Sequence, residues 1–330
     1  MIIYILTFII VIVLIFTNAI TDASNAIATL VGTKVMPFKK AANLSAIFNF
    51  IGIIVMSFIN ISVANCISSM VNLHDSENGM IVLLSGMIAV IVFALLALKS
   101  GIPTSETHGL IAGLTGATIA IYGPQSVSLQ EWKNVLIGLV WSIFGTLVIG
   151  FIIVSVFEEF IKLKNKDIEK MQIIGCCGMS FMHGAQDGQK FIGILIIFFS
   201  LVQNSVIPKE INPMNYVVII VYVAFIMAMG VSIGGKKIVD NIGSQMVELN
   251  NKQALMSDII TVITLFVASM TGIPVSTTHA KTMSIISVGK NKNSKIDKSK
   301  VFGICKAWFW NFPISGMIGY ILAIIISRIV

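Results

Sequence analysis

The chain has 330 residues, of which 56% are hydrophobic and 11% are charged; its mean hydropathy is +0.94 and its formal net charge is +7. This composition excludes an ordinary soluble domain and predicts an all-α integral membrane protein. The positive charge does not indicate nucleic acid, because the loops that carry it report how the chain is oriented in a membrane.

Apolar runs along the chain approach or exceed the roughly 20 residues that a spanning helix needs. The first run has no basic stretch before it and no small-residue cleavage site after it, so we interpret it as a retained span rather than a signal peptide. The segments 101–122 and 272–289 are rich in Gly, Ser and Thr and carry Pro near the start. These features favour broken or re-entrant helices there. In all we predict about ten transmembrane segments, near residues 1–24, 41–64, 79–98, 101–122, 134–157, 173–201, 214–235, 253–271, 272–289 and 301–327.

The lysines predict which end of each span faces the cytoplasm. Alternate loops put sixteen lysines on one side of the membrane, whereas the other side receives only Lys133, Lys209 and Arg328. The positive-inside rule makes the first side cytoplasmic and leaves both termini outside the cell. We therefore expect a multi-pass protein of the cell membrane with extracellular termini.

Two pairs of polar motifs indicate an internal repeat. Asp22 and Asp187 are separated by half the length of the chain, and the segments 101–108 (GIPTSETH) and 272–279 (GIPVSTTH) are separated by nearly the same interval. Five crossings per half is an odd number, so the second half is expected upside down relative to the first. The alternative is four crossings and a hairpin per half, which gives parallel repeats and moves the lysines of the linker outside, against the charge count. We predict a first inverted repeat over 1–157, a cytoplasmic linker over 158–172 and a second inverted repeat over 173–330.

The two aspartates lie in clusters of carboxylate, amide and hydroxyl groups at membrane depth. Such groups are costly in hydrocarbon and mark transport pathways more often than packing accidents, although an aspartate near a helix end can also snorkel to the interface. Hard oxygen ligands suit a small cation, and a buried carboxylate can equally carry a proton. The predicted coupling-ion ligands are Asp22, Asn25, Gln186 and Asp187, and Asp22, Asn25 and Asp187 are the metal ligands if the ion is Na⁺.

Lys190 follows Asp187 by three residues, so both charges share one helical face. It either attracts an anion or only neutralises the aspartate. Gly184 and Gly188 either let a ligand approach the backbone or mark a break in the helix. An oxyanion needs many neutral donors and one or two cations, although Ser and Thr hydroxyls can also bond back to their own helix. The predicted anion-binding residues are Ser105, Thr107, Lys190, Ser276, Thr277 and Thr278.

Three histidines, Glu106 and Lys281 complete the candidates. His108, His183 and His279 are gating or proton-linked candidates, because histidine titrates near neutral pH. The alternative for His108 and His279 is a hydrogen bond that pins a loop. Glu106 has no acidic counterpart in the second copy, and we expect it to face water at the cytoplasmic end. Lys281 lies within an apolar span, and snorkelling, pairing with a carboxylate and attracting the anion are all open to it.

Five stretches carry a family resemblance, namely 18–29, 46–52, 101–109, 183–193 and 272–279. Together they are similar to the signatures of the inorganic phosphate transporter family, the Pit or PiT permeases. The resemblance implies a symporter that imports inorganic phosphate by alternating access, coupled to Na⁺ or H⁺ and with no other cofactor. Carried over by position, it points to Asp22, Asn25, Asp187 and Lys190 and to the Ser/Thr/His segments.

Two departures from the family pattern leave the ion and the oxyanion open. Gln186 stands where the family usually has Asn, and residues 280–284 depart from an apolar, small-residue continuation. A permease for sulfate or another tetrahedral oxyanion is the alternative, and an anion channel is a further one. An intramembrane hydrolase is disfavoured, because catalysis usually needs one asymmetric constellation and this chain carries each candidate twice. The expected partners are phosphate and the lipid bilayer, and a homodimer is left open.

Overall fold

The computed structural model describes residues 1–100, 104–160, 165–240, 249–291 and 297–329. Within these ranges the secondary structure is helical, apart from one isolated antiparallel bridge between Val71 and Val127. Eight helices in the described part of the chain are long and apolar enough to cross a membrane. The predicted all-α membrane fold is therefore confirmed, whereas the count of about ten crossings is not.

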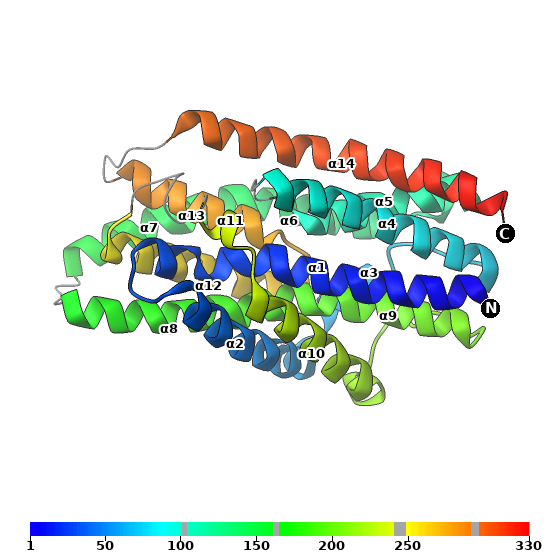
Figure 1. Cartoon of the computed structure of the whole chain (residues 1–330), viewed down its shortest axis with the longest axis horizontal. Coiled ribbons are helices and arrows are strands. Elements are labelled where there is room, and N and C mark those ends of the chain that lie inside the picture. The colour runs from blue at the N-terminus through cyan, green and yellow to red at the C-terminus, as the bar shows by residue number, and fades with distance from the viewer. Residues whose placement is uncertain (101–103, 161–164, 241–248, 292–296, 330) are drawn as a thin grey trace.

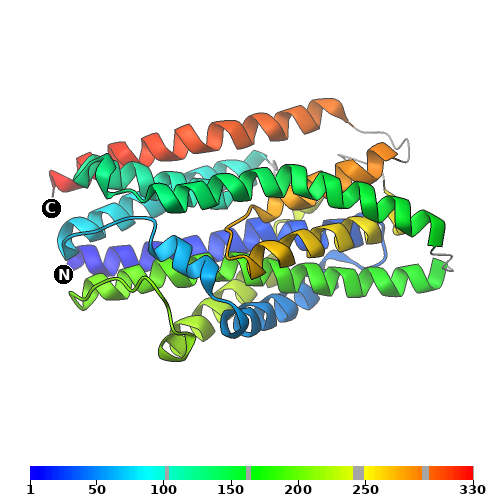
Figure 2. The same cartoon turned by 180° about the vertical axis from the view of Figure 1, so that it is seen from behind.

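Six elements run along the long axis of the bundle, and both termini lie at the same end of it (Figures 1 and 2). Two of the six continue through a turn of π-helix and two are followed by a short second helix. They are α1 (Ile2–Gly32); α2 (Phe38–Ile59) with α3 (Ser62–Ser68); α6 (Leu129–Val140), η2 (Trp141–Gly145) and α7 (Thr146–Phe160); α8 (Asn165–His183), η3 (Gly184–Gly188) and α9 (Gln189–Val202); α10 (Val217–Ile233) with α11 (Lys236–Asp240); and α14 (Lys298–Ser327). The 3₁₀ turns η1 (Pro124–Ser126) and η4 (Pro213–Tyr216) lie in connections.

The remaining four helices form two hairpins whose turns lie part-way along the bundle (Figures 1 and 2). The first hairpin is α4 (Ser76–Ser100) with α5 (Glu106–Tyr122), and the second is α12 (Asn251–Met270) with α13 (Thr277–Asn291). Their short second arms, of 17 and 15 residues, begin at the polar motifs, as expected for re-entrant segments. The ten predicted crossings counted each hairpin as two spans, because α4 and α12 are long and apolar enough to cross.

The two hairpins enter the bundle from opposite ends. At the open end of the first hairpin, Tyr122 donates to Asp75 at 3.0 Å, and the Ser76 hydroxyl bonds Asn204, which follows α9. At the open end of the second, Asn251 donates to Glu169 near the start of α8 at 3.5 Å. Because α8, η3 and α9 form one continuous element, these contacts fix the hairpins at its two extremes.

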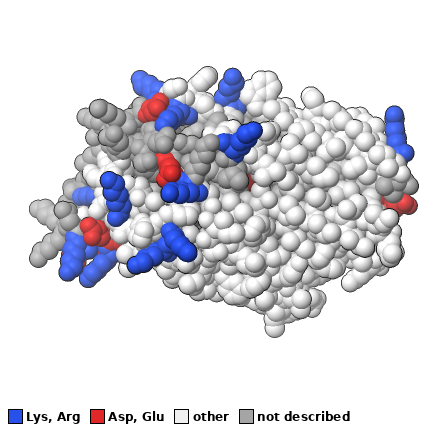
Figure 3. Space-filling model, in the orientation of Figure 1, with Lys and Arg blue, Asp and Glu red and all other residues white. Residues whose placement is uncertain are grey.

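We call one extreme the termini end, where α1 begins and α14 ends. The other is the lysine-rich end, where α1 ends and α8 begins. Lysine side chains gather over the lysine-rich end on the face seen in Figure 3. The described residues of the predicted linker 158–172 lie here: α7 ends at Phe160 and α8 begins at Asn165, and residues 161–164 lie outside the described ranges.

Helix α1 is continuous through Asp22, whereas the second aspartate lies in the π-turn η3. Ala19 stands where the second motif has Gly184, and alanine propagates a helix better than glycine does. The glycines of η3 also let α2 approach. A Cβ at Gly184 would lie 2.3 Å from the carbonyl oxygen of Asn49, and one at Gly188 would lie 2.4 Å from Ile53 Cγ1. The predicted break is thus only a π-turn within a continuous helix, and the approach of a ligand to the backbone stays a prediction.

Candidate functional site

The tips of the two hairpins meet α1 and η3 inside the bundle, and each tip presents the N-terminus of a helix. Ser105 caps α5 by accepting the His108 backbone N–H at 3.3 Å. Ser276 makes the same contact with the N–H of His279 at 3.2 Å. Helix N-termini carry partial positive charge and free N–H groups, so two of them directed at one place favour an anion there.

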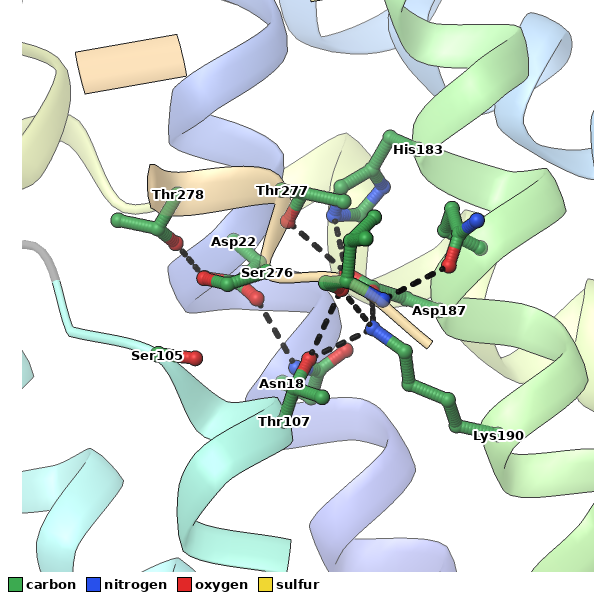
Figure 4. A network of polar contacts seen from close by, with 12 residues as sticks. Asn18, Asp22, Ser105, Thr107, His183, Asp187, Lys190, Ser276, Thr277 and Thr278 are labelled. Atoms are coloured by element: carbon green, nitrogen blue, oxygen red, sulfur yellow. Dashed lines mark hydrogen bonds and ion pairs between the residues drawn. The ribbon is translucent and has the colours of Figure 1, made fainter. Parts of the chain in front are cut away.

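Lys190 joins both hairpins to η3 (Figure 4). Its Nζ donates to Asp187 Oδ1 at 2.6 Å, to Thr107 Oγ1 of the first hairpin at 2.6 Å and to the carbonyl oxygen of Val275 in the second at 2.8 Å. The three N–H donors of the ammonium are therefore all used. The side chain is 2% exposed, so this charge is held by protein groups alone.

The other carboxylate oxygen of Asp187 faces a histidine and a threonine. Thr277 Oγ1 donates to Oδ2 at 3.3 Å, and His183 Nε2 lies 3.0 Å from the same oxygen. Asn49 Nδ2 lies 2.7 Å from His183 Nδ1 and can only donate, so Nδ1 accepts and Nε2 carries the proton. The protonated Nε2 thus lies next to the Asp187 carboxylate, although its geometry there is not that of a hydrogen bond.

Asp22 is the centre of a cluster of amide and hydroxyl groups on α1 and α13. Its Oδ1 accepts from Asn25 Nδ2 at 3.3 Å and from Thr278 Oγ1 at 3.2 Å. Its Oδ2 accepts from Asn18 Nδ2 at 3.3 Å, and Asn25 also donates to Thr278 at 2.9 Å. The structure therefore brings predicted site residues from both halves of the chain into one buried network.

Glu106 also belongs to this network, which corrects the expectation that it faces water at the cytoplasmic end. It is 5% exposed, and its Oε1 accepts a hydrogen bond from Thr21 of α1. Its Oε2 has no partner among the described residues. A cavity of about 10 Å³, close to the room that one water needs, lies beside it and is lined by Asn18, Val90, Glu106, Thr107, Leu110, Asp187, Lys190 and Phe191.

A small cation has a suitable set of ligands here. One ligand atom each of Asp22, His183 and Asp187 lies within 4.8 Å of the others. The side-chain oxygens of Asn18 and Asn25 are buried without a hydrogen-bond partner in the described structure. Carboxylate and amide oxygens are the donors that hard cations such as Na⁺ take, so the residues present fit the predicted ion site.

Other predicted site residues lie at the margin of this network. The Gln186 amide is engaged by the second hairpin, where it donates to Ser269 Oγ at 2.9 Å and accepts from the Val275 N–H at 3.4 Å. Ser105 and Ser276 cap their helices, and Figure 4 draws no contact from Ser105 to the network. These contacts hold the hairpin tips, and a direct role in ligand binding stays a prediction for all three.

His108 and His279 pack edge to face behind the tips, with ring centroids 4.6 Å apart. His108 also stacks on Phe312 at 4.4 Å, and His279 packs against Trp308 at 3.8 Å, both from α14. In the described structure, the ring contacts of the two imidazoles are with each other and with α14, away from the Asp22 and Asp187 clusters. His183 is thus the one of the three predicted histidines that contacts a network carboxylate in the described structure.

Asn18, Thr21 and Glu106 belong to the network but were not among the predicted ligands. Asn18 and Asp22 are four residues apart on α1, so helical spacing alone could have grouped them. Glu106 stands between Ser105 and Thr107, which were both selected. Its partner Thr21 lies 85 residues away in sequence, and only the three-dimensional structure shows that contact.

Comparisons with known proteins agree on one family. A profile of the phosphate transporter family matches residues 18–170 and 162–319. A probable low-affinity inorganic phosphate transporter of Bacillus subtilis (strain 168) is 30% identical over 320 residues, covering 95% of this chain and 94% of that protein. A protein of the same description from Rhizobium meliloti (strain 1021) is 30% identical over 318 residues, covering 92% of this chain and 90% of its own length.

Among solved structures, one described as the sodium-dependent phosphate transporter has the same fold. It matches with a TM-score of 0.83 at 20% identity, and the match covers 100% of both chains. The family resemblance carried by the five polar stretches is thus confirmed by matches that extend over nearly the whole sequence. The chain belongs to the phosphate transporter family.

Proposed function

We propose that this protein is a symporter that imports inorganic phosphate together with Na⁺ or H⁺ by alternating access. One observation carries the proposal: the N-termini of α5 and α13, on hairpins from opposite ends of the bundle, meet at the ammonium of Lys190. Two helix N-termini, one cation and several hydroxyl donors form a suitable environment for a tetrahedral oxyanion. The proposed anion-binding residues are Ser105, Thr107, Lys190, Ser276, Thr277 and Thr278.

The charge balance of the network supports coupling to a cation. Asp22, Glu106 and Asp187 are all buried, and Lys190 is the ammonium that contacts this network in the described structure. A phosphate anion added to this set would meet uncompensated negative charge in a medium of low dielectric constant, which is strongly unfavourable. Na⁺ ions or protons entering with the phosphate remove that charge. This is the physical reason for coupling, with Asp22, Asn25 and Asp187 as the proposed Na⁺ ligands.

Phosphate is favoured over sulfate by an unpaired acceptor of the site. Glu106 lines the small cavity beside Lys190, and its Oε2 is buried without a hydrogen-bond donor among the described residues. Hydrogen phosphate carries a P–OH group that can donate to such an oxygen, whereas sulfate at neutral pH has no proton to donate. A site with unsatisfied buried acceptors discriminates against the ligand that leaves them unpaired. The names of the relatives, which are phosphate transporters, agree with this choice.

The arrangement of elements supports two inverted repeats, over 1–157 and 173–330. Each half contributes three long elements and one hairpin, and the hairpins enter from opposite ends (Figures 1 and 2). A hairpin returns to the side from which it entered, so replacing two crossings by a hairpin leaves the predicted orientation unchanged. The lysine-rich end is then cytoplasmic and the termini are extracellular (Figure 3). Two similar halves of opposite orientation can open in turn to each side.

Radiolabelled phosphate uptake into proteoliposomes tests the proposal. Uptake is measured with an inward Na⁺ gradient, with an inward proton gradient and with neither, each with and without excess sulfate. We expect concentrative uptake with one of the two gradients and little competition from sulfate. Uptake that follows only the phosphate gradient, at rates far above carrier turnover, would instead identify a channel.

The aspartates provide the matching variants. Asp22→Asn and Asp187→Asn should each abolish or strongly reduce concentrative uptake while leaving the protein inserted, because each removes a charge that the coupling ion neutralises. Asp167→Asn, at an exposed position near the start of α8, is the control for the same chemical change outside the network. Full activity in both network variants would refute the site assignment.

A further inference from the structure

Thr29, Asp258 and Lys281 form a second buried charge cluster outside the site described above. The Lys281 and Asp258 side chains are each 0% exposed and form an ion pair. Lys281 Nζ also donates to Thr29 Oγ1 at 3.1 Å, and that hydroxyl lies 2.8 Å from Asp258 Oδ1. The cluster joins both arms of the second hairpin to α1, three elements that lie beside one another in Figure 1.

The chemistry of this cluster repeats that of Lys190. In the main site, the Lys190 ammonium is held by an aspartate, Asp187, and by the hydroxyl of Thr107. At Lys281 the same three residue types meet in the same relation. A lysine, a carboxylate and a threonine hydroxyl are what the proposed phosphate site offers. The second cluster can therefore take the same class of anion, once the carboxylate gives way.

A polar stripe along α1 connects the two clusters. Its members recur at intervals of three and four residues, so they share one face of the helix. Thr29 follows Asn25 by one turn, and Lys281 follows Thr278 by three residues on α13, so the second cluster lies about 5 Å further towards the lysine-rich end. The stripe consists of Asn18, Asp22, Asn25, Thr29 and Thr33.

Beyond Thr29 the stripe leads to the lysine-rich surface. Gln172 of α8 donates to the carbonyl oxygen of Thr29 at 3.2 Å and to Thr33 Oγ1 at 2.7 Å. Thr33 is only partly buried, and α1 ends next to it. A continuous line of polar groups thus runs from Asp22 to the surface that we propose to be cytoplasmic, and Lys281 is the cation beside it.

Stability does not explain the ion pair. A buried pair costs so much desolvation that apolar residues of similar volume are often as good or better. The first hairpin shows that solution: when the GIPTSETH and GIPVSTTH motifs are aligned, the positions equivalent to Asp258 and Lys281 hold Met87 and Leu110, both buried. Charged groups at membrane depth are expensive and mark function by default.

We propose that Lys281 is an anion-binding residue on the cytoplasmic exit path of phosphate. While the path is closed, the ammonium of Lys281 stays paired with Asp258. This inference rests on the proposed function, and it names one residue of the path that phosphate takes from its site to the cytoplasm. When the second hairpin moves away from α1, the contact with Thr29 is lost and the departing phosphate replaces Asp258 on Lys281. Thr282 Oγ1, which is buried and has no partner in the described part of the chain, can supply a neighbouring hydroxyl donor.

The test compares the two faces of the membrane. Right-side-out and inside-out vesicles each expose one face, and the phosphate concentration that half-saturates exchange is measured at each. The variants are Lys281→Gln and the double variant Asp258→Asn/Lys281→Gln, which removes both charges and leaves neither unpaired. Lys40→Gln is the control, because Lys40 is an exposed lysine near the start of α2 at the same end.

We expect both Lys281 variants to raise the half-saturating phosphate concentration at the cytoplasmic face by about tenfold or more, the effect of losing one hydrogen bond to a charged group. The value at the external face should stay within about twofold, and Lys40→Gln should change neither. A double variant with the wild-type value at the cytoplasmic face would overturn the proposal, since the pair is then only structural. Equal rises at both faces would also overturn it. Wild-type vesicles without phosphate exchange at either face would overturn the proposed function itself, and this inference with it.

Discussion

The two hairpins have the same architecture but different interiors. In the first, the arms touch through glycines: a Cβ on Gly113 would lie 2.8 Å from the carbonyl oxygen of Gly86. At the equivalent positions of the second hairpin, in the same motif alignment, there are serines, and Ser257 Oγ and Ser284 Oγ are hydrogen-bonded at 2.8 Å. One hairpin is closed by direct backbone approach, and the other by hydroxyl groups at the same two positions.

The next pair of equivalent positions is also apolar in the first hairpin and polar in the second. Met87 and Leu110 are buried apolar residues of the first hairpin, whereas Asp258 and Lys281 form the buried ion pair of the second. The fold of a hairpin therefore does not require polar residues between its arms. Polar contacts can be exchanged for alternatives more easily than a close-packed apolar interface can slide, because packed interiors are not continuously deformable. At both pairs of positions the arms of the second hairpin are held by polar contacts, and those of the first by backbone approach and apolar packing.

The largest effect is expected where the two hairpins meet. Lys190→Met removes the ammonium that contacts Thr107 of the first hairpin and Val275 of the second, and it leaves Asp187 buried without that cation. A hydrogen bond to a charged group contributes about 1.5–3 kcal/mol, so phosphate uptake should fall by about 10-fold to 100-fold. Proteoliposome uptake measures this, with the exposed Lys133→Met as control. Uptake within twofold of wild type would show that neither tip depends on Lys190.

The second test replaces the buried ion pair between the arms of the second hairpin with the apolar pair of the first hairpin. Asp258→Met/Lys281→Leu gives the second hairpin the apolar pair of the first. We expect thermal unfolding in detergent to be nearly unchanged for the double variant, whereas Lys281→Leu alone should destabilise by about 3–5 kcal/mol because Asp258 is left unpaired. A double variant as unstable as the single one would show that the two interiors are not interchangeable.

The glycine and serine pairs allow a reciprocal exchange with a smaller effect. Gly113→Ser forces a Cβ against the Gly86 carbonyl, and overpacking of this kind costs about 1–3 kcal/mol. Ser284→Gly removes the hydroxyl that contacts Ser257 and Thr261, at about 1 kcal/mol for each lost bond. Both variants should therefore unfold at a lower temperature than wild type, and by similar amounts. A Gly113→Ser variant with the wild-type unfolding temperature would show that the first hairpin does not depend on this close approach of its arms.

Much of this comparison could be read from the sequence. The duplicated GIPTSETH and GIPVSTTH motifs, with their prolines and hydroxyl residues, favoured broken or re-entrant helices over 101–122 and 272–289, and α5 and α13 begin inside these motifs. Each hairpin was nevertheless counted as two crossings, for a physical reason. Helix α4 has 25 residues and α12 has 20, and length and apolarity do not reveal that a helix ends inside the bundle.

The contacts between distant segments were the least predictable part. Lys281 was noticed because it interrupts an apolar span, but its partner Asp258 lies on the other arm of the hairpin, 23 residues earlier in sequence. Glu106 was expected to face water because the second copy has no acidic residue at that position, and its partner Thr21 lies 85 residues away in sequence. Periodicity assigns residues to a face of one helix, and it does not say which other helix that face will meet.

The smallest effect concerns the open end of the first hairpin and its response to pH. Burial acts to raise the pKa of Asp75, but hydrogen bonds from Asn78 and Tyr122 outweigh it and hold that pKa below its ordinary value. A carboxylate with a lowered folded-state pKa stabilises the protein above its unfolded-state pKa of about 3.9, and this stability is lost as the pH falls through the lowered value. Asp75→Asn should therefore lower the unfolding temperature at pH 7 by no more than about 2 °C, because Asp75 is exposed, and the difference from wild type should shrink below about pH 4. A difference that grows on acidification would show that the contact with Tyr122 does not close this hairpin.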